Sequence, residues 1–467
     1  MDRREIIRAA GAATLASITG NSIATDKAGP KTAAAKWQVP SIRRIELGND
    51  FFLSKTNPLA TADQRDLEAL ALKVLEMPAV IKAKEQLARR YKTIVGNQAS
   101  AEAMARFNLM LEEFPVRYVQ VAVNSDPNYP KVMGCLHSGP HEWFGMKFPG
   151  GRSGQGDGPD TNYIMIPIAW DAHYEVHGRR FDKTLADQSY TASGDFGIST
   201  TTAFLAALDM KINTDGTFVI TLGPEPANGR ANHIQTTPES RFLFIRNNRS
   251  DWRQIPDAHV VRRLDPPTGP PLTIEQIANR AAWYMMYDVS NNYMLVRYMT
   301  TIEQNTTIGP FKAVALGGLE SQRAAMGYLK LADDEAFVIT LSGNVPYHSI
   351  TLFDYWFRSF DYWNHTSNLN NAQGADNPDG STTYVVSIQD PGVHNWLDPV
   401  GYHEPVFWVR WQGRRWTAGE TPWAKSQLVK LNDIDRVLPA DMKRVTPEER
   451  KQQLAEREAT YKLRFAV

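Results

Sequence analysis

The sequence contains one cysteine, Cys135, in 467 residues, so no disulfide can form within the chain. One thiol is also too few to ligate an iron–sulfur cluster or a thiolate zinc site. Net charge is missing as well, because 51 Lys and Arg residues balance 51 Asp and Glu residues. Without a basic surplus, we predict no binding to nucleic acid or to an anionic membrane.

Several catalytic and nucleotide-binding signatures are also missing. The chain has no G-x-S-x-G elbow, which excludes an ordinary α/β-hydrolase, and it has no Walker motif. The glycine-rich stretch GGRSGQGDG at 150–158 lacks the strand-to-helix context of a dinucleotide site. We interpret this stretch as a flexible loop or a lid. The sequence therefore requires no cofactor.

Residues 1–24 are typical of an export signal. Arg3 and Arg4 precede an apolar, alanine-rich stretch from Ile6 to Ile18, and small residues around Ala24 provide a cleavage site. The stretch is too short for a stable membrane span. The pattern resembles a twin-arginine signal, which exports proteins already folded. We therefore expect a periplasmic or secreted protein, with a cytosolic N-terminal helix as the alternative.

Beyond residue 24, the hydrophobic periodicity predicts a fold that is mainly β with flanking helices, in the α+β class. Residues 25–115 are predicted to be a linker followed by a helical segment. Short alternating runs separated by turns predict one β-sandwich over 116–264 and a second over 305–425. A helical segment at 265–304 connects them, and 426–467 form a helical tail. We therefore predict two antiparallel, jelly-roll-like sandwich domains.

Local signals predict where individual elements begin and end. Thr61 with Gln64, and Thr273 with Gln276, have the spacing of a capping box at the start of a helix. Pro115 is expected to end a helix, because proline lacks the backbone donor that a helix interior needs. The alternating run VRYVQVAV at 116–123 is predicted to be the first strand.

Two stretches are similar to a known bacterial family. The first is DMKINTDGTFVITLGPEP followed by RFLFIRNNRSDWRQIP, and the second runs from LADDEAFVITLSG to DPGVHNWLDPVGYHEPVFWVRW. Over residues 160 to 412 they resemble the family called domain of unknown function 1214, which is often paired with domain of unknown function 1254. The resemblance implies β-sandwich, jelly-roll-like domains with flanking helices, and it implies no particular reaction. The positions that match its pattern are Asp215, Gly216, Arg246, Asp251 and Trp252 in the first stretch, and Asp361, Tyr362, Asn368, Asn395, Trp396, Leu397, Asp398 and Arg410 in the second.

The segment from 389 to 412 is the first candidate for a binding site. Strand alternation places Trp408 and Arg410 on one face. An arginine beside a tryptophan can bind a carboxylate or sulfate while the indole covers an apolar body. The alternative is that Arg410 pairs with Asp398 or Asp361 and only holds the hairpin in place. Further candidates for substrate binding are Trp396, Asn395, Tyr362 and Asn368.

The same segment contains candidate catalytic residues. His403 and His394 flank the connector that carries Asp398. A histidine oriented by a carboxylate can act as a general acid or base near neutral pH, so we assign His403 as acid/base and Asp398 as its orienter. The family commonly has a polar residue at His403 and a proline or another residue at His394. Plain polar surface residues are the alternative.

Two histidine groups are candidates for a divalent metal. His137 and His141 are separated by Gly139 and Pro140, so only a loop could bring them to a metal. His173 and His177 flank Glu175 with a spacing of two, which places all three on one strand face. A solvated sheet face is the alternative.

Together these features predict an exported enzyme that acts on a small organic or glycan-like substrate. Acid–base chemistry by histidine and carboxylate suits a hydrolase, lyase or isomerase without a nucleotide cofactor. The alternative is a non-catalytic periplasmic binding protein for a glycan or a hydrophobic small molecule, with some of the twelve tryptophans as platforms. The sequence leaves the oligomeric state open.

Overall fold

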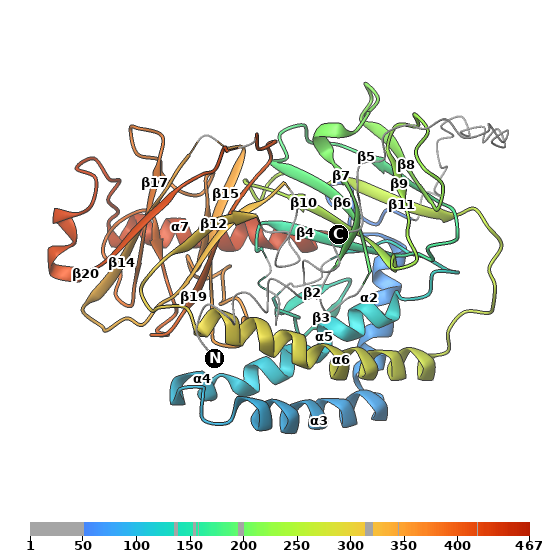
Figure 1. Cartoon of the computed structure of the whole chain (residues 1–467), viewed down its shortest axis with the longest axis horizontal. Coiled ribbons are helices and arrows are strands. Elements are labelled where there is room, and N and C mark those ends of the chain that lie inside the picture. Colours follow the sequence, from blue (N-terminus) through green and yellow to red (C-terminus); the bar gives the residue numbers. More distant parts are fainter. Residues whose placement is uncertain are drawn as a thin grey trace.

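The computed structural model describes residues 51–134, 139–152, 156, 158–194, 200–312, 321–343, 345–417 and 419–467. The predicted export signal and the candidate ligand His137 lie outside these residues. Two β-sandwiches lie side by side, and helices form a layer along one side of both (Figure 1). The fold is therefore mainly β and belongs to the α+β class, as the periodicity predicts.

The first sandwich consists of strands β1 (Met133–Gly134), β4 (Thr161–Pro167), β5 (Tyr174–Arg179), β6 (Asp187–Ser193), β7 (Thr201–Ala206), β8 (Thr217–Gly223), β9 (His233–Gln235), β10 (Phe242–Asn248) and β11 (Ala258–Arg263). Among the described residues they form two sheets, in the orders β1-β4-β10-β6-β7 and β11-β5-β8-β9. Ile245 and Tyr190 of one sheet pack with Val176 and Ile220 of the other. This core uses every second residue of each strand, so the remaining side chains face outward.

The second sandwich consists of strands β12 (Ile308–Lys312), β13 (Arg323–Tyr328), β14 (Glu335–Leu341), β15 (Tyr347–Phe353), β16 (Asn368–Asn370), β17 (Thr382–Ser387), β18 (Trp396–Leu397), β19 (Val406–Gln412) and β20 (Ala424–Lys430). In the described part of the chain, the sheet orders are β12-β13-β19-β15-β16 and β18-β17-β14-β20. Most neighbouring strands pair antiparallel, while β17 pairs parallel with β18, as β8 does with β9.

The helices are α2 (Ala62–Leu75), α3 (Pro78–Val95), α4 (Ala101–Ala105), α5 (Phe107–Val123), α6 (Ile274–Thr300) and α7 (Pro447–Lys462). The capping box predicted at Thr273 is confirmed, because its side chain and that of Gln276 each bond the other's backbone N–H. Thr61 likewise caps α2 by accepting from the Gln64 backbone N–H. A short hairpin, β2 (His141–Trp143) with β3 (Met146–Phe148), precedes the first sandwich.

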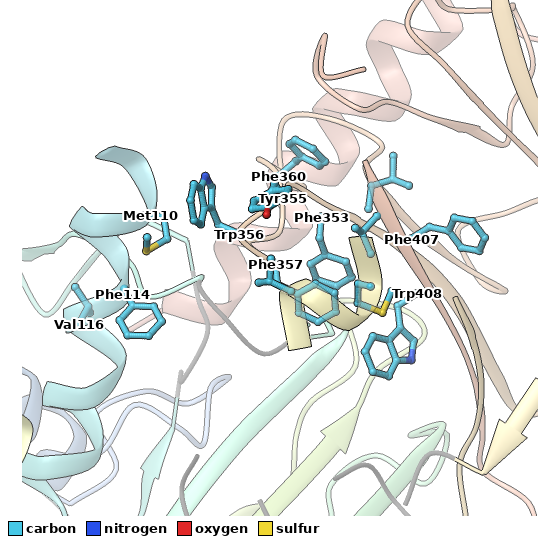
Figure 2. Packing of buried hydrophobic residues seen from close by; sticks show 14 of the residues in the cluster. Met110, Phe114, Val116, Phe353, Tyr355, Trp356, Phe357, Phe360, Phe407 and Trp408 are labelled. Carbon is cyan, nitrogen blue, oxygen red and sulfur yellow. The ribbon is translucent and has the colours of Figure 1, made fainter. Parts of the chain in front are cut away.

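The predicted strand at 116–123 is wrong, because α5 continues through Pro115 to Val123. Every residue of α5 from Glu113 to Val123 is buried, so this part of the helix shows no division into a polar and an apolar face. A short apolar run of this kind cannot be assigned to strand or helix by periodicity alone. One hydrophobic cluster joins α5 to the second sandwich, and Figure 2 shows Met110 and Phe114 on the α5 side and Phe357 and Trp408 on the other.

The two sandwiches meet through polar side chains. Asn248 of β10 donates from Nδ2 to Gln412 Oε1 of β19 at 2.9 Å, and the Tyr347 hydroxyl of β15 donates to Asp160 at 2.8 Å. Helix α7 crosses behind this junction (Figure 1). Just after α7, Arg464 donates to the Pro159 carbonyl. The outward faces of the β10 and β19 sheets therefore confront each other in the interior.

No helix among the described residues has both the length and the apolar character that crossing a membrane requires.

Candidate functional site

Strand β19 alternates as predicted between the interior of its own sandwich and the face toward the first sandwich. The Phe407 ring lies 5.5 Å from Phe337 of β14, inside the second sandwich. The Trp408 ring instead lies 5.7 Å from Phe357, on the opposite side of the sheet (Figure 2). Arg410 shares the Trp408 face, since its Cζ lies 5.4 Å from the Trp408 ring centroid.

Arg410 is buried, with 8% of its surface exposed, yet it has no protein counter-ion in the described part of the chain. Its Nη2 donates to the Gly156 carbonyl, whereas Nη1 has no hydrogen-bond partner. No ion pair forms with Asp398, which bonds His365 Nδ1 at 2.7 Å, or with Asp361, which accepts from Asn364 at 2.9 Å. The alternative in which Arg410 only holds the hairpin through a carboxylate is therefore wrong.

Arg246 of β10 lies on the sheet face that confronts Arg410. Its Cζ is 4.5 Å from the Phe244 ring centroid, and Phe244 stacks on Tyr163 at 5.5 Å. Nη1 donates to Thr191 Oγ1 at 3.2 Å. Arg246 matches the family-like pattern of the first similar stretch, and it was not among the predicted binding residues. The sequence does contain a signal for Arg246, because it is an arginine in the middle of a strand whose alternate residues, Leu243 and Ile245, belong to the apolar core.

Burial changes the protonation of the groups around Arg246. Burial lowers the pKa of Arg246 to about 10, and the positive charge of Arg410 acts in the same direction. Burial raises the pKa of Asp187, on the neighbouring strand β6, to about 7, although Arg246 opposes this shift. Asp187 Oδ2 is buried without a hydrogen-bond partner. The charge of the site therefore changes with pH near neutrality.

The predicted pair of His403 and Asp398 does not form. His403 is on the surface, where Nδ1 lies 3.1 Å from Glu102 and Nε2 lies 2.9 Å from Asp333. These two carboxylates raise the pKa of His403, with Asp333 contributing most. Asp398 orients His365 instead, and that hydrogen bond raises the pKa of His365. His365 was not among the predicted site residues.

His394 and Trp396 are bonded to backbone in the connector that precedes β19. His394 Nε2 lies 3.2 Å from the Gln373 carbonyl, and burial lowers the pKa of this histidine. Trp396 Nε1 donates to the Ser387 carbonyl at 3.0 Å. Arg450 of α7 lies over the Trp396 ring at 5.3 Å. Both residues therefore stabilise the connector against α7.

Asn395, Tyr362 and Asn368 are buried and bonded. The side-chain amide of Asn395 accepts from the Ala375 N–H through its oxygen and donates to the carbonyls of Ala375 and Thr383 through its nitrogen. The Tyr362 ring packs edge-on against Trp252 and Tyr461. These contacts hold loops and α7 in place, at positions that the sequence assigned to substrate.

Asn368 of β16 is connected to the junction between the sandwiches. Its Nδ2 donates to Thr351 Oγ1 at 3.0 Å, and its Oδ1 accepts from Arg457 at 3.3 Å. Thr351 of β15 pairs in register with Asn368 on one side and with Trp408 on the other. Asn368 is therefore separated from the candidate site by the single strand β15.

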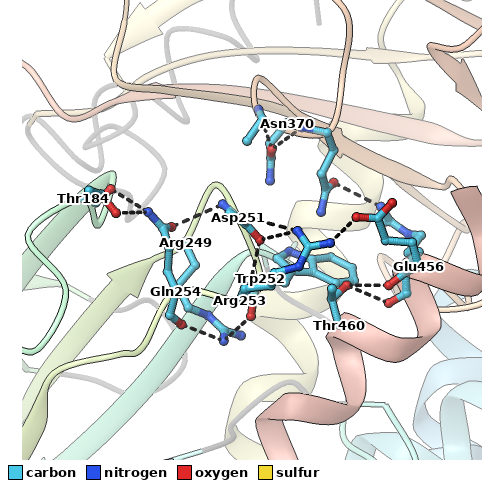
Figure 3. A network of polar contacts seen from close by, with 12 residues as sticks. Thr184, Arg249, Asp251, Trp252, Arg253, Gln254, Asn370, Glu456 and Thr460 are labelled. Atoms are coloured by element: carbon cyan, nitrogen blue, oxygen red, sulfur yellow. Dashed lines mark hydrogen bonds and ion pairs between the residues drawn. The ribbon is translucent and has the colours of Figure 1, made fainter. Parts of the chain in front are cut away.

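The segment with Asp251 and Trp252 anchors α7 to the first sandwich. Arg253 donates to Asp251 at 3.2 Å and also to Glu456 of α7 (Figure 3). Trp252 Nε1 donates to the buried Asp160 at 2.7 Å. This part of the family-like pattern therefore has a structural role.

The candidate metal ligands among the described residues, which exclude His137, each have their own partner. His173 bonds Asp265 at 3.0 Å and Glu225 at 2.9 Å through opposite ring nitrogens, and His177 bonds Glu175 at 2.9 Å. His141 Nδ1 lies 2.9 Å from the Gly139 carbonyl, and its ring stacks on Phe465. Across the described ranges, no group of three or more His, Cys, Asp or Glu side chains is arranged to hold a metal ion.

The described residues of the glycine-rich stretch, 150–152, 156 and 158, are buried, and the interpretation of the whole stretch as a flexible loop or a lid stays a prediction. Arg152 donates from Nη2 to Glu113 of α5 at 2.6 Å. At Gly156, a Cβ atom would come within 2.3 Å of the Phe357 ring, so only glycine allows this approach. This close approach also places the Gly156 carbonyl where it accepts a hydrogen bond from Arg410.

Comparisons with known proteins support the fold and leave the function open. Models of known protein families give no match to the chain, and curated proteins give none either. The crystal structure of an uncharacterized protein from Burkholderia cenocepacia is similar, with a TM-score of 0.64 and 22% identity, over 78% of this chain and 99% of that one. At this identity the likeness shows the fold alone.

The VPA0106 protein from Vibrio parahaemolyticus aligns with a TM-score of 0.35 and 13% identity, over 58% of this chain and 90% of that one, which is too distant to support an argument. The resemblance to domain of unknown function 1214 stays a prediction.

Proposed function

We propose that the protein binds a small organic anion between its two sandwiches, and that Arg410 and Trp408 hold this ligand. The observation that supports the proposal is a buried guanidinium that has a free Nη1 and no ion pair among the described residues. Burying a charge without a counter-ion costs several kcal/mol, of the order that proteins offset by pairing. A ligand carboxylate could accept from Nη1 while its apolar body lies on the indole.

This site favours the binding role over the predicted histidine chemistry. His403 has both ring nitrogens bonded to carboxylates elsewhere on the molecule. An enzyme of the hydrolase, lyase or isomerase type is the second candidate, and Asp187 favours it. Its pKa of about 7 suits proton transfer near neutral pH. Export through a twin-arginine signal at residues 1–24 remains part of the proposal, and it would place binding in the periplasm or outside the cell.

Native mass spectrometry of the mature protein, purified from its own host, tests the proposal. We expect the wild-type protein to retain an organic anion and the Arg410→Gln variant to lose it. Arg436→Gln is the matched control, because Arg436 is 80% exposed at its side chain. The same anion retained by wild type and Arg410→Gln would contradict the proposal. So would a wild-type protein that is empty and binds no organic anion at millimolar concentration in calorimetry.

A further inference from the structure

We propose that Arg246 forms the opposite side of the same site, and that the ligand is an aromatic carboxylate held between two guanidinium groups, one from each sandwich. The inference rests on the proposed function, because it names the ligand class of that site. It adds a residue from the first sandwich that the sequence analysis did not assign to binding.

A direct hydrogen bond between the sandwiches places the two arginines near each other. Asn248 follows Arg246 by two residues on β10, and Gln412 follows Arg410 by two residues on β19. Residues two apart on a strand point to the same face and are separated by about 7 Å. Since Asn248 donates to Gln412 at 2.9 Å, both arginines lie one such step from a point of contact. The influence of Arg410 on the pKa of Arg246 agrees with this proximity.

The charges at this junction call for an anion. Neither Arg246 nor Arg410 forms an ion pair within 4.0 Å with a carboxylate of the described residues. Two guanidinium groups of like charge repel each other in a medium of low dielectric constant. Burial raises the pKa of Asp187, the carboxylate that acts on Arg246, to about 7, so this group opposes the positive charge of the arginines less than an ordinary carboxylate would. A ligand carboxylate between the arginines would supply the missing negative charge.

Unused hydrogen-bond donors lie around the two arginines. Ser189 pairs in register with Arg246, and its buried hydroxyl has no hydrogen-bond partner. Trp408 Nε1, on the Arg410 face, is also buried without a partner. Ser189 Oγ, Trp408 Nε1 and Arg410 Nη1 can all donate hydrogen bonds. A carboxylate is bound through hydrogen bonds that its oxygens accept from such donors.

Aromatic rings line both sides of the junction. Phe244 and Tyr163 stack on the side of the first sandwich and keep part of their surface exposed. Trp408 and Phe357 lie on the side of the second sandwich. Aromatic rings pack favourably against other flat rings, in stacked or edge-on arrangements. The combination of flat apolar walls and cationic groups therefore selects a carboxylate with a planar body.

Calorimetric titration of the mature protein with benzoate and 2-naphthoate tests the inference, with benzamide as the neutral control ligand. We expect both acids to bind and benzamide to bind far more weakly. Arg246→Gln and Arg410→Gln should each weaken binding about 10- to 100-fold, the loss typical of one charge-assisted hydrogen bond. Arg436→Gln should bind like wild type, and circular dichroism should show that every variant is folded.

The possible results separate this inference from the proposed function. Wild-type affinity in Arg246→Gln, with binding lost in Arg410→Gln, would overturn the role of Arg246 and leave anion binding at Arg410 intact. Equal binding of benzamide and benzoate, or no binding of either acid by a protein that retains another anion, would overturn the ligand class. Unchanged binding in both variants would overturn both proposals.

A second substitution covers a failure of Arg246→Gln to fold. Arg246→Lys keeps the charge and loses the planar fork that contacts a carboxylate with two nitrogens. We expect this variant to bind benzoate more weakly than wild type does. Wild-type affinity in folded Arg246→Lys would contradict guanidinium contact.

Discussion

The molecule contains two pairs of buried or partly buried arginines, and they differ in what lies between them. Arg152 and Arg358 both donate to Glu113 of α5, at 2.6 and 2.5 Å. Burial alone would raise the pKa of Glu113, and the two arginines outweigh it, so the pKa is lowered. Arg246 and Arg410 have no such glutamate among the described residues. The first pair shares a carboxylate of the protein itself, whereas the second pair has none within ion-pair distance among the described residues, and the proposed ligand would supply one.

The comparison separates a structural role from a binding role for the same residue type. A buried ion triad such as that of Glu113 is complete without any ligand, so its loss should be felt in stability. A pair of arginines without a protein carboxylate, here called the open pair (Arg246 and Arg410), lowers the stability of the free protein. It acquires an anion only when a ligand binds, and such a loss of stability is common at functional sites. The following predictions test whether the two pairs differ in this way.

The largest change in stability is expected when the pair formed by Arg152 and Arg358 loses the carboxylate of Glu113. Glu113→Gln leaves the buried Arg152 without its carboxylate partner and leaves Arg358 with only Asp354, 4.0 Å away, so the free energy of unfolding should fall by about 3–5 kcal/mol. Denaturant-induced unfolding measures it. Glu112→Gln is the control, since that side chain is 70% exposed and pairs with Lys84 at the surface. A loss in Glu113→Gln as small as in Glu112→Gln would show that the triad is not structurally important.

The open pair should respond to substitution in the opposite way. Arg410→Gln should leave the free energy of unfolding of the ligand-free protein unchanged or raise it, because the substitution removes a buried charge that has no counter-ion among the described residues. Benzoate at 100 times its wild-type dissociation constant should stabilise wild type by about 2.7 kcal/mol, and the same concentration should stabilise the variant by only about 0.4–1.4 kcal/mol, because its binding is expected to be about 10- to 100-fold weaker. Thermal unfolding with and without benzoate measures both effects. A large loss in the ligand-free variant would make the second pair structural, like the first.

The sequence predicted those parts of the fold and of the open pair's site that depend on local patterns along the chain. Local alternation placed Trp408 and Arg410 on one face, and capping chemistry at Thr273 located the start of α6. The partnership of Arg246 with Arg410 depends on how two separately folded sandwiches dock, and no local periodicity encodes that. The pairing of Asp398 with His365 likewise depends on a loop that returns from outside the hairpin.

A smaller effect should appear when the pH is changed. Because burial raises the pKa of Asp187 to about 7, its protonated form stabilises the fold below about pH 4. That contribution is lost as the pH rises through about 7. The ionised carboxylate also opposes an incoming anion, so benzoate binding should weaken about fivefold or more between pH 6 and pH 8.

The Asp187→Asn variant tests the source of this pH dependence. The neighbouring groups keep their charge in this range, because the pKa of Arg246 is about 10 and burial holds the pKa of Tyr347 well above 10. The variant should therefore bind benzoate equally well at both pH values, as measured by calorimetry. A pH dependence that persists in Asp187→Asn would assign it to another group.

The smallest effect is expected at His403, the residue that the sequence assigned to catalysis. His403→Gln removes contacts to Glu102 and Asp333 at the surface, and exposed ion pairs contribute about 0–1 kcal/mol. Benzoate affinity should not change, because His403 bonds neither arginine of the open pair. The comparison of the two arginine pairs would then hold without any contribution from the predicted histidine. A loss of benzoate binding comparable to that of Arg410→Gln would instead connect His403 to the site and restore its predicted role.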